Sequence, residues 1–219
     1  MREYRVRVSD RFLETATLAA VEAYSHGDGR KKRKEIETLG LVWGHCRTRA
    51  EETVIFLDRL AVSLSAEREA GSVMPNAGAI SLMAEVMERL APDQLLLGDF
   101  HSHPYRDLAE VQMIKGYEFS DGDFDAFLAD DAIWDRTNNA PVMVVATVCR
   151  LGRVHESGGD HIRNNVWWFD VGQFRFWLNV CVGFLDEAGK RRHTGNKRSC
   201  VWLDLNSRFF NDSGDRVEA

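Results

Sequence analysis

The sequence predicts an α/β fold in which a mixed β-sheet is flanked by helices on both faces. Three observations lead to this expectation. Strand and helix patterns alternate along the 219 residues, apolar residues make up 44% of the chain, and no segment repeats with a period of about 20 to 50 residues. With a prior of about 150 residues per domain, we expect residues 1–219 to form a single domain.

The charge balance and hydropathy argue against several classes of function. The chain has 28 Lys and Arg against 34 Asp and Glu, a net charge of −6. Non-specific nucleic-acid binding relies on cations that replace phosphate counterions, so no nucleic-acid partner is expected. The longest apolar run, 142–149, is shorter than the roughly 18 residues of a membrane span, so no membrane association is expected. Residues 1–10 lack the continuous apolar segment of a secretory signal, which favours a cytoplasmic location.

The four cysteines are far apart in the sequence, at Cys46, Cys149, Cys181 and Cys200. This spacing suits neither a CxxC zinc pattern nor a disulfide framework. Because three of them lie in strongly apolar stretches, we expect buried, reduced thiols.

The chain begins with a short alternating strand over 4–8. Asp10 can cap the helix that follows, whose apolar side chains repeat at helical spacing and which ends near 25–29. The charged run 30–34 is interpreted as a solvated loop, the commonest role of such runs.

The next elements frame the central part of the chain. The second half of 35–44 predicts a buried strand with glycines where other atoms come close, and 53–65 predicts its neighbour. Residues 79–90 have one apolar helical face and end at an Ala-Pro-Asp sequence. A short apolar strand is expected over 95–100.

The C-terminal half predicts a helix over 120–130 and a β-branched buried strand over 141–150. Two aromatic-rich runs, 166–169 and 174–184, predict further strands. They belong to an aromatic-rich C-terminal extension, 160–219, whose large side chains are more typical of a core than of an exposed surface.

The most informative segment is Gly-Asp-Phe-His-Ser-His-Pro, ending at Pro104. On a strand, residues i and i+2 project to the same face, so His101 and His103 can present two imidazoles to one point where the strand ends. Catalytic zinc takes three protein ligands, often imidazole and carboxylate, and keeps one position for water. A third ligand is then required; without one, two structural histidines at a strand end are the alternative.

A candidate third ligand lies at the start of the predicted helix. Ser120 and Asp123 form S-x-x-D, which places both side chains on the side of the strand end if Ser120 is near the N-cap. Asp121 and Asp125 compete for the role, and the spacing from Ser120 favours Asp123. The same pair fits an ordinary capping box, and both interpretations can hold at once.

The combination of motifs resembles the JAMM metalloprotease family, also called the JAB/MPN domain. The family signature is H-[ST]-H-P followed by S-x-x-D, with an upstream glutamate that opens a strand of the form E-x-x-G-x-x-x-G. Residues 37–44 match this strand, and the order of the motifs also matches. Glu35 is a rival for the glutamate, but the glycine spacing selects Glu37. The resemblance covers 37–148, the motif core.

This resemblance implies a cytidine-deaminase-like (JAB/MPN) fold and a zinc-dependent hydrolase of amide or isopeptide bonds. It implies that His101, His103 and Asp123 are the Zn²⁺ ligands, that Glu37 is the general acid/base and that Ser120 donates a hydrogen bond to the developing oxyanion. Family members process or deconjugate ubiquitin-like or other tailed proteins, so a protein or peptide substrate is expected.

The chain departs from the family in three places. The spacing from Pro104 to Ser120 is longer than usual, Phe119 replaces a frequent proline, and Asp99-Phe100 replaces a common aromatic pair. Residues 105–119 therefore form an insertion, which we interpret as a substrate-gripping or lid element.

Other functions fit the motifs less well. A non-catalytic MPN-type interaction scaffold is the main alternative, but catalytically dead members lose the ligands and this chain keeps them. The metallo-β-lactamase pattern needs Asp and His directly after H-x-H, where Pro104 and Tyr105 stand. An amidohydrolase barrel normally needs a longer chain.

Overall fold

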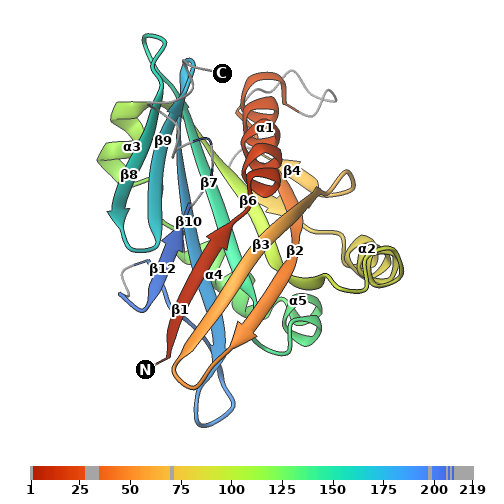
Figure 1. Ribbon diagram of the computed structural model, residues 1–219. Coiled ribbons are helices and arrows are strands. Elements are labelled where there is room, and N and C mark those ends of the chain that lie inside the picture. The colour runs from red at the N-terminus through yellow and green to blue at the C-terminus, as the bar shows by residue number, and fades with distance from the viewer. Residues whose placement is uncertain are drawn as a thin grey trace, which may run out of the picture.

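The computed structural model describes residues 2–27, 35–69, 72–196, 199–205, 207 and 209 (Figure 1). The predicted loop at 30–34 lies outside them. The strands are β1 (Glu3–Val8), β2 (Leu39–Thr48), β3 (Glu52–Val62), β4 (Glu67–Glu69), β5 (Ser72–Met74), β6 (Leu95–Asp107), β7 (Val142–Arg150), β8 (Ser157–Arg163), β9 (Val166–Val171), β10 (Phe174–Leu185), β11 (Arg191–His193) and β12 (Val201–Asp204). The helices are α1 (Asp10–His26), α2 (Ala77–Leu90), α3 (Leu108–Ile114), α4 (Asp121–Ala129) and α5 (Asp131–Arg136).

Ten of the described strands form one mixed sheet, which confirms the predicted α/β class. Its order is β12-β1-β3-β2-β6-β7-β10-β9-β8, with β11 paired to β10, and β4 and β5 form a separate hairpin. The pairs β12–β1, β1–β3 and β6–β7 are parallel, whereas the other neighbours are antiparallel. Strand β6 is therefore held on both edges, by β2 and by β7.

The sheet curls so that its two ends approach one another (Figure 1). The N–H group of Leu203 on β12 donates to the carbonyl oxygen of Asn164 in the β8–β9 connection, at 2.7 Å. Inside the curl, one apolar cluster joins α1 to side chains from β1, β7, β10 and β12. The C-terminal strands thus complete the same core that the N-terminal strand and helix begin.

Helix α1 occupies the inner face of the sheet. Ser9, and not Asp10 as expected, is its N-cap: the Ser9 hydroxyl oxygen accepts from the N–H of Phe12 at 3.1 Å. Asp10 instead occupies the first helical turn, where a negative charge suits the helix dipole. The helix ends at Gly27, whose φ of 69° is readily available to glycine.

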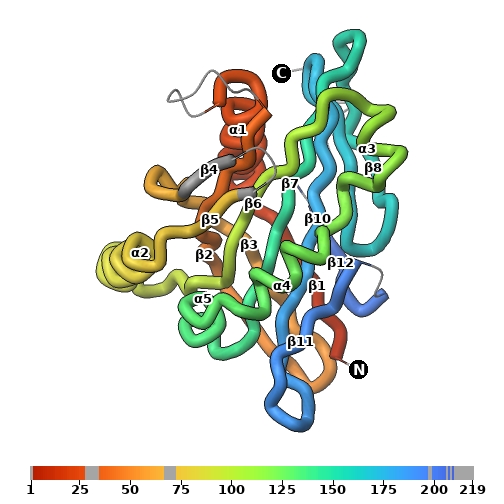
Figure 2. The backbone as a smooth tube through the Cα atoms, turned by 180° about the vertical axis from the view of Figure 1, so that it is seen from behind, coloured from red at the N-terminus to blue at the C-terminus, as the bar shows by residue number. Residues whose placement is uncertain are grey.

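Helices α2 to α5 lie across the outer face, so helices flank the sheet on both sides (Figure 2). Strand β7 contributes side chains to both faces. Met143 and Val145 pack against α4 and α5 on the outer face. The side chains that β7 gives to the inner cluster are Val142, Val144, Ala146 and Val148. Burial on both sides explains why this strand is apolar without alternation.

Several expectations need correction. Strand β6 continues to Asp107 rather than ending near Pro104, so the histidines lie within the strand. The four cysteines are all free, but Cys46 is exposed and Cys200 is half-buried. Helix α5 and the short strands β4, β5, β8, β11 and β12 were not predicted, because short or polar segments have weak periodicity. Among the described residues, no helix is long and apolar enough to span a membrane.

Candidate metal centre

The two predicted histidines face the same side of β6. His101 and His103 are both buried, at 7% exposure each, and their ring centroids are 4.9 Å apart. Because β6 pairs with β2 on one edge and β7 on the other, the backbone that carries both rings is fixed. The strand therefore presents two rigidly placed imidazoles to the outer face of the sheet.

Asp123 reaches the histidines from the first turn of α4. Ser120 is the N-cap of this helix and forms a capping box with Asp123: the Ser120 N–H donates to Asp123 Oδ2 at 2.7 Å, and the Asp123 N–H donates to Ser120 Oγ at 3.1 Å. The same carboxylate places Oδ1 3.4 Å from His101 Nε2 and Oδ2 3.4 Å from His103 Nε2. The capping and ligand interpretations of S-x-x-D thus hold together.

These three side chains could hold a metal ion. Their candidate ligand atoms all lie within 4.8 Å of one another. Zinc bonds of about 2.0–2.1 Å in tetrahedral geometry separate ligand atoms by roughly 3.3 Å, close to the two 3.4 Å contacts. His101 Nε2 is buried and makes no hydrogen bond within the described structure, as expected of an atom reserved for a cation.

The tautomer of His103 suits the same role. Its Nδ1 lies 3.4 Å from the carbonyl oxygen of Gly116, a contact in which Nδ1–H donates. The Thr147 hydroxyl donates to the same oxygen at 2.9 Å and fixes its position. With Nδ1 donating, Nε2 has a lone pair for a cation that His103 would share with Asp123, as in metal sites where a second contact orients the histidine.

The charges of the three groups follow from burial and mutual contact. Burial alone would raise the pKa of Asp123, but contacts with His101 and His103 outweigh it and hold the pKa well below its usual range. Burial lowers the pKa of His101 despite the opposing effect of Asp123. For His103 the contact with Asp123 outweighs burial, and its pKa is raised. Asp123 is therefore the anionic member of the group.

Glu37 lies beside this group. It and Thr38 are the two residues that directly precede β2. Thr38 and Ser102 clamp it there: the Thr38 N–H donates to Ser102 Oγ at 2.9 Å, and the Ser102 N–H donates to the Thr38 carbonyl at 3.0 Å. Glu37 is 8% exposed. Burial is the main cause that raises its pKa to about 7. The nearby His103 opposes this shift, and the charge of Asp123 adds to it. The result is a carboxyl group able to exchange a proton near neutral pH.

The rival residues are not among the candidate ligands. Glu35 is exposed, with a φ of 61°, and lines the second cavity without joining the buried group. Asp121 and Asp125 are exposed on α4, and neither belongs to the cluster of candidate ligands. The structure therefore brings Glu37, His101, His103, Ser120 and Asp123 together.

Two cavities meet at this group. One, of about 480 Å³, extends from His101 toward α2 and the β4–β5 hairpin. The other, of about 490 Å³, extends from His103 along the insertion, past Tyr105 and Glu110. Glu37, Ser120 and Asp123 line both cavities. The site is therefore the midpoint of a groove with two arms.

Sequence reasoning missed the residues that hold the insertion and the Ser120 loop. Asn196 Oδ1 accepts from the Phe119 N–H at 2.8 Å, and Asn196 Nδ2 donates to the Phe119 carbonyl at 2.9 Å. Asn179 Nδ2 donates to the Tyr117 carbonyl at 2.9 Å, and Arg163 pairs with Glu118 at 2.5 Å. No pattern along the chain connects these residues to Ser120, because they come from the C-terminal extension.

Asp99 is a further missed residue, also on β6 and lining the first arm. Burial, reinforced by the nearby charges of Asp130 and Asp123, raises its pKa to about 8. The metal group and Asp99 thus face the same arm of the groove.

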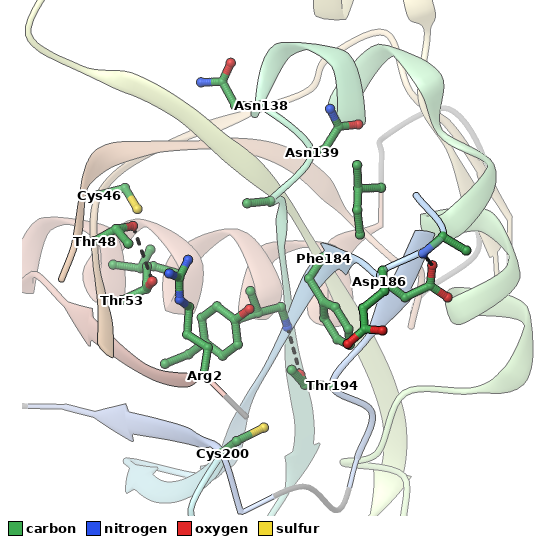
Figure 3. Close-up of a pocket in the computed structure, with 17 residues that line it drawn as sticks. Arg2, Cys46, Thr48, Thr53, Asn138, Asn139, Phe184, Asp186, Thr194 and Cys200 are labelled. Atoms are coloured by element: carbon green, nitrogen blue, oxygen red, sulfur yellow. Dashed lines mark hydrogen bonds between the residues drawn. The ribbon is translucent and has the colours of Figure 1, made fainter. Parts of the chain in front are cut away.

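A cavity of about 1010 Å³, larger than either arm of the groove, lies apart from this centre (Figure 3). Arg2, Cys46, Cys200 and the turn residues Asn138 and Asn139 line it. None of its residues belongs to the His-His-Asp group, and no other metal-ligating group is found within the described residues. Size alone therefore does not identify the functional site.

No model of a known protein family matches the chain, and no curated protein matches it. The function is accordingly argued from the geometry of the centre itself.

Proposed function

We propose that the protein is a zinc-dependent hydrolase that cleaves amide or isopeptide bonds, of the JAMM (JAB/MPN) type. The observation that carries this proposal is the buried His101–His103–Asp123 group with Glu37 beside it, at the midpoint of a groove. The mixed sheet with helices on both faces and the order of the motifs along the chain support the same assignment.

The chain supplies each group that amide hydrolysis requires. Zinc held by the three ligands would polarise a water molecule and the substrate carbonyl. Glu37 accepts the proton of the attacking water and delivers it to the leaving amine nitrogen as the C–N bond breaks. A carboxyl group whose pKa is near 7 suits both transfers at neutral pH.

Ser120 has the position of an oxyanion donor. Its Oγ accepts the Asp123 N–H, and its side chain lines both arms of the groove. Within the described structure its own hydroxyl proton has no acceptor, so it is free to donate to the carbonyl oxygen of a bound substrate. One well-placed donor of this kind contributes about 3 kcal/mol to transition-state stabilisation.

The groove favours an extended protein segment as substrate. An open arm on each side of the centre accommodates chain on both sides of a scissile bond, as the tail of a ubiquitin-like or other tailed protein would require. The insertion lines the second arm through Tyr105, Arg106 and Glu110. Because α3 is fixed to the sheet through the buried Val111, the gripping role is favoured over that of a moving lid.

A non-catalytic interaction scaffold is the second candidate, and one observation favours it. Leu82, Val86 and Leu90 repeat at helical spacing on α2 and are 62%, 51% and 73% exposed. Such an apolar stripe is typical of a surface that contacts another protein. The buried ligand group and Glu37 have no use in a scaffold, and this favours the enzyme.

The test is cleavage by zinc-loaded protein of peptide and ubiquitin-like conjugates, compared with the Glu37→Gln variant. We expect the wild type to release product and the variant to lose at least about 100-fold in kcat, because general acid–base catalysis contributes about 10² to 10⁴. Asp125→Asn, which removes an exposed acid of α4 that lines neither arm, is the matched control and retains activity. Equal activity of wild type and Glu37→Gln would remove Glu37 from the mechanism, and a zinc-loaded wild type inert on all conjugates would favour the scaffold.

A further inference from the structure

The first arm of the groove has a carboxyl group among apolar walls. Asp99 lies two residues before His101 on β6, so both side chains project from the same face of the strand, about 7 Å apart along it. Asp99 and His101 line the same cavity of about 480 Å³. A ligand in this arm can therefore contact the candidate metal centre at one end and Asp99 about 7 Å further along the strand.

The walls of this arm are apolar. Leu39, Ile80, Phe127, Met74 and Met143 contribute to its lining, from five different elements or their boundaries. They offer dispersion contacts and apolar area along its length but no hydrogen bonds from their side chains. The arm thus suits a long aliphatic group rather than a polar one.

Asp99 has no counter-charge in the described structure. No hydrogen bond or ion pair is formed by its carboxyl group with any described residue. Of the other three acids that line the arm, Glu37 lies beside the candidate ligands as the proposed proton carrier, and the remaining two are engaged. Asp130 caps α5 by accepting from the Ile133 N–H at 3.0 Å, and Asp123 contacts both histidines. No Lys, Arg or further His side chain besides His101 lines the cavity. Asp99 is half-buried and lines the cavity, so a cationic group that enters the arm can reach its carboxyl group and pair with it.

We propose that this arm is a specificity subsite for a lysine or arginine side chain next to the scissile bond, with Asp99 pairing its cationic end. This subsite rests on the proposed function, because it specifies the substrate class of the same site. The aliphatic stem of such a side chain lies along the apolar walls, and the charged head reaches the carboxylate.

The first experiment measures binding without turnover. Methionine methyl groups labelled with ¹³C report on the arm by NMR, because Met74 and Met143 line it and Met113, 80% exposed on α3, does not. The probes are n-butylguanidine and its neutral analogue n-butylurea, which have the same stem and similar shape. The protein is used as purified, and its zinc content is measured on the same sample.

We expect n-butylguanidine to shift the Met74 and Met143 signals, with a Kd at least about tenfold lower than that of n-butylurea. Met113 stays unmoved. In Asp99→Asn, which keeps the side-chain shape, the two probes bind with equal Kd. Asp125→Asn, which removes an exposed acid of the neighbouring helix outside the cavity, keeps the preference.

Equal Kd values for the two probes in the wild type would overturn the proposal, as would an undiminished preference in Asp99→Asn. If Asp99→Asn fails to fold, as judged by its methyl spectrum, the wild-type comparison of the two probes still decides. This binding result does not depend on catalysis, so its failure and the failure of the proposed function are distinguishable.

Turnover provides the second readout. In a peptide series that varies each residue flanking the scissile bond, arginine at one position is expected to raise kcat/KM at least about tenfold over citrulline, its neutral analogue. Asp99→Asn removes this preference, so the variant cleaves the arginine and citrulline peptides with equal kcat/KM. A wild type that cleaves both peptides equally contradicts the subsite.

Discussion

Glu37 and Asp123 are the two carboxyl groups on which the proposed chemistry depends. Their surroundings shift their pKa values in opposite directions. Asp123 contacts two imidazoles, and its pKa is held well below the usual range. Glu37 is buried without such contacts, and its pKa is raised to about 7. Opposite shifts in adjacent carboxyl groups are typical of a ligand beside a proton carrier.

This difference predicts how stability depends on pH. In metal-free protein the folded-state pKa of Glu37 lies above the ordinary value of 4.5, so the folded state binds the proton more tightly than the unfolded state does. Stability that this proton contributes is present below about pH 4.5 and is lost as pH rises through 7. Glu37→Gln lacks this loss. We expect the free energy of unfolding of the variant, measured relative to the wild type, to be higher at pH 8 than at pH 5 by up to about 3 kcal/mol.

Urea unfolding of both proteins at the two pH values measures the effect. Glu35→Gln is the control, because Glu35 is exposed two residues away. A stability difference between Glu37→Gln and the wild type that stays constant from pH 5 to pH 8 would show that Glu37 titrates normally.

At the scale of elements, strong periodicity was a good guide and short segments were not. The strands at 4–8 and 141–150 and the helix at 79–90 were found nearly as predicted, because each has a clear apolar pattern. The proximity of His101, His103 and Asp123 was also predictable, since two histidines at i and i+2 and a capping box are local patterns. Glu37 was selected only by the glycine spacing of the family resemblance. Strand β8, whose residues alternate little and are partly exposed, gave no such signal.

Contacts between distant elements could not be predicted. The Ser102–Thr38 clamp that places Glu37 spans 64 residues, and the Asn196–Phe119 contact spans 77. Asparagine is common in surface turns, so nothing local marks Asn196 as a support of the Ser120 loop. Only the curl of the sheet brings the C-terminal extension to the insertion.

The Asn196 contact predicts a local effect on the loop that precedes α4. Asn196→Ala removes both hydrogen bonds to Phe119, which are worth about 1–3 kcal/mol together. We expect amide exchange over 117–123 to become about 10- to 100-fold faster, with zinc retained and kcat lowered more than KM is raised.

Asn164→Ala is the matched control. Asn164 is half-buried, and within the described structure its side chain donates only to the Ser199 carbonyl, at 3.3 Å. Hydrogen exchange read by mass spectrometry over the loop compares the two variants. Unchanged exchange in Asn196→Ala would mean that the Ser120 loop is held by other contacts.

At the scale of the whole molecule, the two faces of the curled sheet have different roles. The inner face holds α1 and the main apolar cluster, whereas the outer face bears α2 to α5 and the groove. The His101–His103–Asp123 group lies where the central strand β6 meets α4, between the two arms of the groove. The net charge of −6 is compatible with this arrangement, since Asp99 and Glu110 contribute acidic side chains to the two arms.

The central claim is that His101, His103 and Asp123 bind zinc, and metal analysis of the purified protein tests it most directly. After zinc-replete purification and removal of free metal, we expect about one zinc ion per chain in the wild type and in Glu37→Gln. His101→Ala and Asp123→Ala are expected to lose it, whereas His45→Ala, an exposed histidine outside the group, retains it. Wild-type protein without zinc, or full zinc content in His101→Ala and Asp123→Ala, would contradict the account.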